Sequence, residues 1–492
     1  MTHYIGGVWQ AGEGPSFTSH DPSSGALLWT GQEAAVDQVA AAVSAASAAF
    51  DNWALTAFDD RIAIIRRYGA LVAEHKREFA ELIAKEAGKT LWDALGEATA
   101  TANKVEISLK AYEERTGTRE ALNGGIRSRL THRPHGVMAV FGPYNFPAHL
   151  PNGHIVPALI AGNTIVLKPS EITPRVAEFM VKLWEKAGLP AGVLNLVQGG
   201  RSVGEALVAA EGIDGLLFTG SAKGGLAISR ALQDRPQIIQ ALEMGGNNPL
   251  IVHEADDLCA AAVLTILSAF VSSGQRCTCA RRLIVPEGAA GDAFIETLLG
   301  VIAKITVGAW ADDPQPFIGP VVSSAAADLV LGAQSALLAQ GAVALRPAVR
   351  LARGDAFLAP GLLDVTAVKN RPDEEIFGPL LQLVRVADFE AAIAEANNTK
   401  YGLASGLISD SRALYENFYP RARAGIVNWN QQLTGAASTA PFGGIGWSGN
   451  HRPSAYYAAD YCSFAVASME QAEGKVAVAA MPTGLDLGED TA

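Results

Sequence analysis

The sequence of 492 residues is poor in cysteine and in charged side chains, and each shortage excludes a class of protein. Its four cysteines are too few for a disulfide scaffold and lack the paired CxxC spacing of zinc clamps. We therefore expect no metal site and a reducing compartment. Charged residues make up 18% of the chain, against about 25% in an average soluble protein, while apolar residues make up 49%. This composition requires large buried cores and excludes disorder for most of the chain.

Positive charge is also in deficit, with 38 Lys and Arg against 50 Asp and Glu and a formal net charge of -12. Such a chain repels phosphate backbones and anionic headgroups, so nucleic acid and membrane surfaces are not expected partners. The longest nearly apolar run, 258–271, is shorter than the ~20 residues of a membrane span and predicts a buried helix. Neither end of the sequence resembles a targeting signal, so we expect a cytoplasmic protein.

Hydrophobic patterning predicts an α/β fold. After a hairpin that turns at Gly6 and Gly7, apolar residues at helical spacing predict helices over 32–56, 59–88 and 90–115. Short continuous apolar runs then alternate with helical stretches, as in βαβ units of a parallel sheet: 137–141, 164–167, 193–197, 215–218 and 238–242. After Gly246 the alternation of strand-like and helix-like segments begins again. This predicts a second α/β domain with strands near Leu250, Leu283, Leu381, Leu407 and Ile426.

Two segments fit neither sheet. Residues 126–135 carry closely spaced basic side chains, and 456–469 is an aromatic-rich strand candidate. A basic ligand site is one interpretation of the first segment, and an interface strand with alternating polar residues is the more common one. A tail rich in small residues follows residue 473.

Cys277 and Glu243 are the side chains best placed for chemistry. Cys277 lies in SSGQRCTC after the apolar helix, and it is either an activated nucleophile or a buried thiol. The other cysteines are predicted to be packing residues: Cys259, Cys279 and Cys462. Glu243 ends an apolar strand in ALEMGGNNP, where it is either a general base or a structural strand-end glutamate.

Four further motifs also lie beside predicted strands. In FGPYNFP, Asn145 could donate to an oxyanion or satisfy turn carbonyls. FTGSAKGG opens a helix with a degenerate GxGxxG spacing, a weak indication of pyrophosphate binding by Gly220, Ser221, Ala222, Lys223, Gly224 and Gly225. LKPSE and EEIFGP suit either a ribose site or a surface loop, through Lys168, Glu171, Glu375 and Phe377.

The order FGPYNFP, LKPSE, FTGS, ALEMGGNNP, GQRC, EEIFGP and PFGGIGWSGN resembles the aldehyde dehydrogenase superfamily, from the first hairpin to near Cys462. The resemblance implies that Cys277 is the nucleophile, Glu243 the general base and Asn145 an oxyanion donor, with NAD as cofactor. It also implies cofactor contacts: Lys168 and Glu171 at the adenosine ribose, 220–225 at the pyrophosphate, and Glu375 with Phe377 at the nicotinamide ribose and ring.

The resemblance also implies a role for each segment of the chain. It implies a Rossmann-type cofactor domain, an α/β catalytic domain and a small sheet that assembles a homodimer or larger homo-oligomer. The corresponding residues are 1–115 and 136–245 for the NAD-binding domain, 246–450 for the catalytic domain, 116–135 and 451–472 for oligomerisation, and 473–492 for the tail.

Less widely shared stretches, such as STAPFGGIGWSGNHRPSAYYAADYC, resemble the branch that oxidises N-succinylglutamate 5-semialdehyde in arginine catabolism. We therefore expect a small acidic aldehyde as substrate, with candidate cations at Arg276, His451 and Arg452. A carboxylate at Glu171 would repel a 2'-phosphate and favour NAD over NADP. Three alternatives are a dehydrogenase of another acidic semialdehyde, a CoA-acylating dehydrogenase and a non-catalytic binding protein. The presence of Glu243 counts against the second, and the presence of the whole catalytic set counts against the third.

Overall fold

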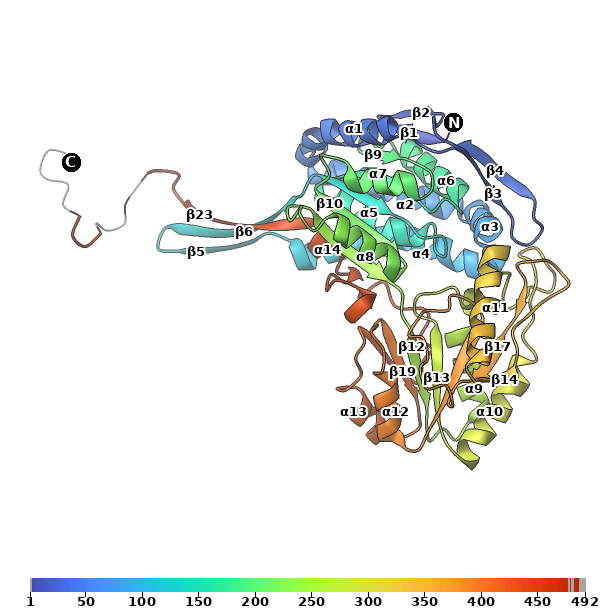
Figure 1. Ribbon diagram of the computed structural model, residues 1–492. Coiled ribbons are helices and arrows are strands. Elements are labelled where there is room, and N and C mark those ends of the chain that lie inside the picture. Colours follow the sequence, from blue (N-terminus) through green and yellow to red (C-terminus); the bar gives the residue numbers. More distant parts are fainter. Residues whose placement is uncertain (1, 477, 479–481, 486–492) are drawn as a thin grey trace, which may run out of the picture.

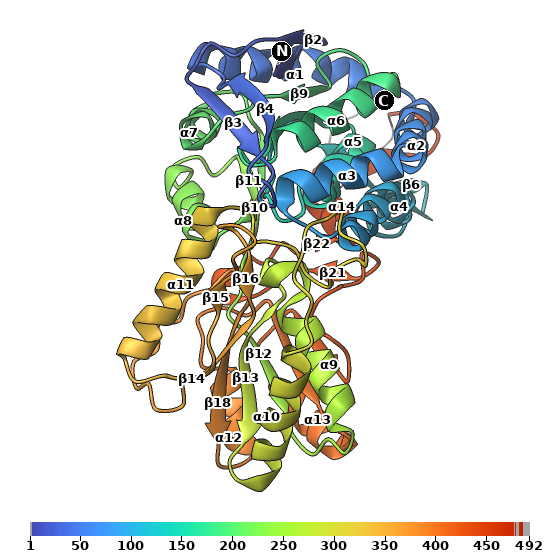
Figure 2. The same cartoon turned by 90° about the vertical axis from the view of Figure 1, so that its right-hand side faces the viewer.

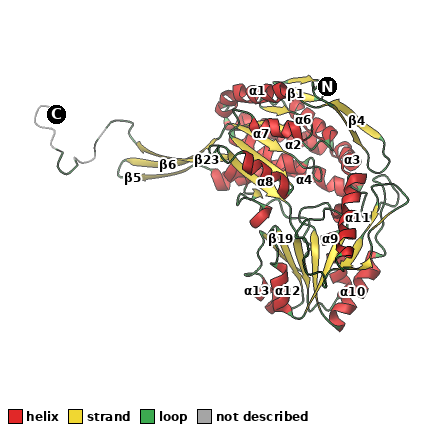
Figure 3. Cartoon of the chain, in the orientation of Figure 1, coloured by secondary structure: helices red, strands yellow, loops and turns green. Residues whose placement is uncertain are grey.

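The computed structural model describes residues 2–476, 478 and 482–485, and the other positions of the predicted tail lie outside the described residues. Within the described part, two lobes are each built on a seven-stranded sheet, and a three-stranded sheet projects from one lobe (Figure 1). Helices flank both of the larger sheets (Figure 3). The predicted α/β fold class is therefore confirmed.

The first sheet has the strand order β11-β10-β7-β8-β9-β1-β2. The hairpin β1 (His3–Ile5) and β2 (Val8–Gln10) forms its antiparallel edge, and Gly6 and Gly7 have the positive φ of the predicted turn. The other strands are parallel: β7 (Val137–Phe141), β8 (Thr164–Lys168), β9 (Leu194–Leu196), β10 (Gly215–Gly220) and β11 (Ile239–Met244).

Alternate side chains of these strands face two helical layers. Met138 and Val140 face the larger layer of α2 (Phe58–Glu74), α3 (Lys76–Ala87), α4 (Leu91–Thr116), α5 (His149–Ala161) and α6 (Pro174–Lys186). Val137 and Ala139 face α1 (Val36–Leu55), α7 (Arg201–Ala209) and α8 (Ala222–Ala231). The single helix predicted over 59–88 is wrong, because the backbone leaves helical geometry at His75. The hairpin β3 (Ser16–His20) and β4 (Leu27–Gln32) is mostly exposed or half-buried and has no clear apolar alternation, so the hydrophobic pattern does not predict it.

The second sheet has the order β14-β17-β18-β13-β12-β19-β20, with β14 (Val343–Arg346) antiparallel. Its parallel strands are β12 (Asn248–Val252), β13 (Ala280–Pro286), β17 (Gly361–Asp364), β18 (Leu380–Val386), β19 (Ala404–Ile408) and β20 (Ile426–Trp429). One face is covered by α9 (Leu258–Ala269) and α10 (Ala289–Ile302), and the other by α11 (Ser324–Ala339), α12 (Phe389–Ala396) and α13 (Arg412–Phe418) (Figure 2).

The prediction of α9 as a buried helix is wrong for one of its faces. Val263 is 44% exposed, and Cys259 is exposed rather than a packing residue, because α9 covers the sheet with only one side. No helix in the described ranges is both long and apolar enough to span a membrane.

The two unassigned segments pair with each other. β6 (Ile126–Pro134) is the central strand of the projecting sheet, between β5 (Arg119–Asn123) and β23 (Ser463–Gln471). The strand predicted over 456–469 is wrong in its first part, since α14 (Ala458–Tyr461) precedes β23. Apolar side chains stay exposed on this sheet: Leu122, Phe464 and Met469.

Candidate active site

The site candidates lie where the parallel strands of the first sheet end. Parallel strands present their carboxyl ends at one edge, and such edges are where ligands bind in open α/β sheets. Asn145 follows β7, Lys168 ends β8, Ser221 follows β10 and Glu243 lies near the end of β11. The chain then crosses to the second sheet through Gly245 to Asn247, so the same edge faces the second lobe (Figure 1).

The loop of Cys277 is held from several sides. It follows a 3-10 turn, η1 (Val271–Gly274), and leads into β13. Asn145 Nδ2 donates to the Gln275 carbonyl at 2.9 Å, and Asn248 Nδ2 donates to the Cys277 carbonyl at 2.7 Å. Gly274 has φ +73°, and a Cβ there would lie 2.1 Å from the Gly378 carbonyl oxygen. Glycine is thus required where the GQRC and EEIFGP motifs touch.

The Cys277 side chain is partly buried. Burial, followed by the nearby carboxyl groups of Glu375 and Glu243, raises its pKa to about 12, while the guanidinium of Arg281 opposes this shift. The structure thus brings the thiol and both glutamates together, although they come from separate motifs.

Glu243 is 4% exposed, and its Oε2 has no hydrogen-bond partner among the described residues. Burial raises its pKa well above the usual value, and the backbone amide of Ser454 opposes this shift. A Cβ on Gly443 would lie 2.8 Å from Glu243 Oε1, so the PFGG turn packs directly on the carboxyl group. A buried carboxyl group with a free oxygen can exchange a proton with a water molecule beside the thiol.

The residues predicted for the adenosine side lie along the same edge. Lys168 Nζ donates to the Pro169 carbonyl at 3.0 Å and lies 3.7 Å from the half-exposed carboxylate of Glu171. Ser221 caps α8 by accepting from the Gly224 N–H, and Lys223 is exposed beside it. Ala222 and Gly225 are buried, and a Cβ on Gly225 would lie 2.4 Å from the Met244 sulfur. Gly225 therefore serves the close packing of α8 on β11.

Glu375 and Phe377 share a partner that sequence reasoning missed. Arg281 Nη2 lies 3.2 Å from Glu375 Oε1, and its Cζ lies 5.1 Å from the Phe377 ring centroid. The same guanidinium donates to the carbonyls of Gly274 and Arg276, both of which lie within the GQRC motif. The sequence feature that could have indicated a buried role for Arg281 is the pair of arginines at the start of the otherwise apolar strand β13, in ARRLIVP.

The remaining candidates are the possible substrate-binding cations and the other cysteines, and their surroundings differ. The Arg276 guanidinium is engaged by Asp93 at 2.7 Å. His451 and Arg452 are exposed after the PFGG turn, and His451 has a positive φ. Cys279 and Cys462 are buried, as predicted.

The aldehyde dehydrogenase family matches residues 9–465 of this sequence. The chain belongs to this family. It is 57% identical over 469 residues to an N-succinylglutamate 5-semialdehyde dehydrogenase from Ectopseudomonas mendocina (strain ymp), covering 95% of this chain and 96% of that protein.

Solved structures of the family agree with the fold. A succinate-semialdehyde dehydrogenase from Burkholderia pseudomallei is 32% identical, with a TM-score of 0.88 over 96% of this chain and 98% of its own. An indole-3-acetaldehyde dehydrogenase in complex with NAD+ is 30% identical, with a TM-score of 0.88 over 96% of each chain. The protein therefore has the aldehyde dehydrogenase fold and is an oxidoreductase.

Proposed function

We propose that the protein oxidises N-succinyl-L-glutamate 5-semialdehyde to N-succinyl-L-glutamate with NAD, in arginine catabolism. The observation that carries this proposal is the 57% identity to a relative of that name over nearly the whole of both chains. The partly buried thiol and the buried carboxyl group beside one sheet edge supply the chemistry that such a reaction needs. The soluble metabolites of such a pathway fit a cytoplasmic enzyme.

Cys277 is the proposed nucleophile. Loss of the thiol proton to water leaves a thiolate, and its attack on the aldehyde carbon would form a thiohemiacetal alkoxide. This oxyanion would accept hydrogen bonds from Asn145 Nδ2 and the Cys277 backbone N–H. One N–H of the Asn145 amide already holds the Gln275 carbonyl, which fixes the direction of the other. After oxidation to the thioester, Glu243 would take a proton from the attacking water.

The residues at the sheet edge suit a dinucleotide. The exposed start of α8, where the Ser221 side chain engages only the Gly224 N–H of the first turn, is a favourable place for a pyrophosphate. Lys168 and Glu171 would hold the adenosine ribose, and Glu375 and Phe377 the nicotinamide ribose and ring. NAD, when bound, supplies the hydride acceptor. The Glu171 carboxylate would repel a 2'-phosphate, which favours NAD over NADP.

We also propose the domain roles and a homo-oligomer. Residues 1–115 and 136–245 would bind NAD, and 246–450 would carry the nucleophile. Segments 116–135 and 451–472 would join subunits, because the projecting sheet leaves an unpaired edge at β5 and exposed apolar side chains. A homodimer or larger assembly in light scattering at micromolar concentration would support this assignment, and a monomer would refute it.

The test of the proposed reaction is NADH formation with a panel of aldehydes. N-succinylglutamate 5-semialdehyde should have the highest kcat/KM, above glutamate semialdehyde by about ten- to a hundredfold. The unsuccinylated aldehyde carries a cationic amine and lacks the distal carboxylate. Equal kcat/KM values for the two would refute the substrate and leave the family unaffected.

A further inference from the structure

Three buried charged side chains form a stripe along α4. Asp93, Glu97 and Lys104 are 4%, 2% and 1% exposed. At 3.6 residues per turn, their positions lie within about 40° of one another around the helix axis. Buried charges are rare without a partner, so the partner of each one indicates its role.

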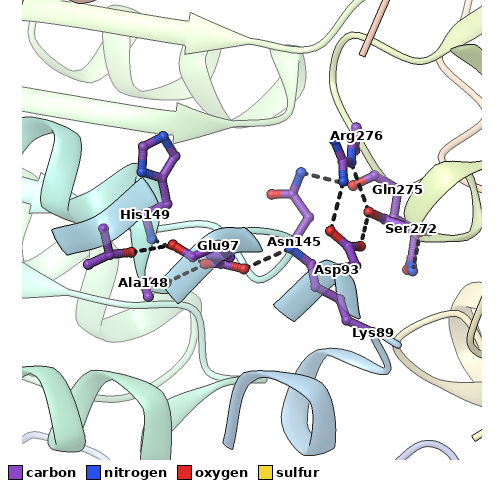
Figure 4. A network of polar contacts seen from close by, with 10 residues as sticks. Lys89, Asp93, Glu97, Asn145, Ala148, His149, Ser272, Gln275 and Arg276 are labelled. Carbon is purple, nitrogen blue, oxygen red and sulfur yellow. Dashed lines mark hydrogen bonds and ion pairs between the residues drawn. The ribbon is translucent and has the colours of Figure 1, made fainter. Parts of the chain in front are cut away.

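Asp93 holds the segment that leads into Cys277. Its Oδ1 lies 2.7 Å from Arg276 Nη2, and its Oδ2 accepts from Ser272 Oγ at 2.5 Å (Figure 4). Arg276 Nε also donates to Ser272 Oγ at 2.9 Å, which closes a three-residue ring. Lys89 and Arg276 hold the pKa of Asp93 below its usual value despite burial. Asp93 is therefore an ionised anchor for the residue before the nucleophile.

Glu97 holds the turn of Asn145 from the next turn of the helix. Its Oε1 accepts from the backbone N–H groups of Ala148 and His149 at 2.9 and 3.1 Å, and its Oε2 accepts from Lys89 Nζ at 2.7 Å. These two amides lie three and four residues after Asn145, where α5 begins (Figure 4).

A single ring connects the two anchors. The Phe146 centroid lies 3.4 Å from Lys89 Nζ and 5.1 Å from Arg276 Cζ, so the ring contacts one cation from each anchor. The Asn145 turn and the GQRC loop are thereby fixed relative to α4 as well as to each other.

Lys104 holds the segment that covers Glu243. Its Nζ donates to the Ala455 carbonyl at 2.8 Å, and Ala455 lies in β22 (Ser454–Ala455). The neighbouring Ser454 supplies the backbone amide that favours the ionised form of Glu243. β22 pairs with β21 (Pro441–Phe442), and Gly443 directly after β21 packs on the Glu243 carboxyl group.

We infer that Asp93, Glu97 and Lys104 are positioning residues. From one helix, they hold the segments that carry or cover the catalytic groups in fixed relative positions. The inference rests on the proposed function of Cys277, Asn145 and Glu243. A displacement of about 1 Å at reacting groups can cost about 10²-fold in rate. Asp93 and Glu97 act on thiohemiacetal formation, and Lys104 acts on thioester hydrolysis.

The test separates the two steps in the full-length enzyme. Stopped-flow NADH formation in a single turnover measures thiohemiacetal formation together with hydride transfer, and rapid-quench release of the carboxylate measures hydrolysis. We expect Asp93→Asn and Glu97→Gln to slow NADH formation about tenfold or more. Lys104→Met keeps most of the buried stem, and we expect it to slow hydrolysis by a similar factor while single-turnover NADH formation changes less than about threefold.

Two further variants keep the test decisive. Ser272→Ala removes only the bridging hydroxyl, so it should fold and should slow NADH formation in the manner of Asp93→Asn. Asp214→Asn is the matched control, because Asp214 accepts from the Val137 N–H at 2.8 Å at the opposite edge of the same sheet. Both steps should keep their rates in this control.

The outcomes separate this inference from the proposed function. If the unmodified enzyme forms no NADH from any acidic aldehyde, the proposed function fails. If the enzyme is active but the Asp93, Glu97 and Lys104 variants all slow both steps by one common factor, the three residues serve folding only and the inference is overturned. It is also overturned if these variants slow neither step. Slower NADH formation in Ser272→Ala with a normal rate in Asp214→Asn would support it.

Discussion

Replacing Arg281 by Met should destabilise the fold and disturb the nucleophile loop together. Arg281 is 0% exposed, and its guanidinium lies 3.2 Å from Glu375 Oε1 and donates to the Gly274 and Arg276 carbonyls at 2.5 and 2.9 Å. Met fills similar volume but leaves the buried Glu375 carboxyl group without its guanidinium partner and removes the donor to the Gly274 carbonyl. The Arg276 carbonyl still accepts from the Cys279 N–H at 3.0 Å. Breaking a buried ion pair costs about 3–5 kcal/mol. The raised pKa of Glu375 lets it take up a proton, which places the expected loss near 3 kcal/mol.

Unfolding in guanidinium chloride, followed by circular dichroism, measures this loss of stability. The alkylation rate of Cys277 measures how accessible and reactive the thiol in the nucleophile loop is. Adding Glu375→Gln should recover part of the stability, because it removes the unpaired acid. Arg282→Met is the matched control: Arg282 is equally buried and pairs with Glu395 at 3.3 Å. It should lose similar stability while Cys277 alkylation stays unchanged. A loss below about 1 kcal/mol for Arg281→Met, or no recovery with Glu375→Gln, would refute the reasoning.

Four other predictions follow from the site and its surroundings. Cys277→Ser should lower NADH formation by more than about 10³-fold and leave NAD binding intact by calorimetry, whereas Cys279→Ser should keep substantial activity; equal losses would mean a misplaced nucleophile. Glu243→Gln should slow hydrolysis more than NADH formation, leaving a stoichiometric burst, and loss of the burst would contradict a role in hydrolysis. Glu171→Gln should raise the NADP-to-NAD ratio of kcat/KM about tenfold, and an unchanged ratio would remove Glu171 from the ribose site. Burial raises the pKa of Glu86 from 4.5 to about 7, so its stabilisation is present below pH 4.5 and is lost as pH rises through 7. Glu86→Gln should flatten this part of the stability–pH curve by up to about 3 kcal/mol, and an unaltered curve would contradict the shift.

The sequence by itself determined most of the parallel strands and the family. Parallel strands covered on both faces need continuous apolar runs, and this pattern is local, so β7, β8 and β10 could be found within a residue or two. The ordered motifs are local as well, and they predict Cys277 and Glu243 as candidate catalytic residues.

Only the tertiary structure decided which charged groups support the site. Asp93 and Arg276 are 183 residues apart in sequence, and Lys104 and Ala455 are 351 apart. On an amphipathic helix a charged side chain predicts a solvent-exposed face, yet α4 buries three of them. Their burial is favourable only because partners from distant segments neutralise or hydrogen-bond each charge, and a linear pattern does not contain those partners.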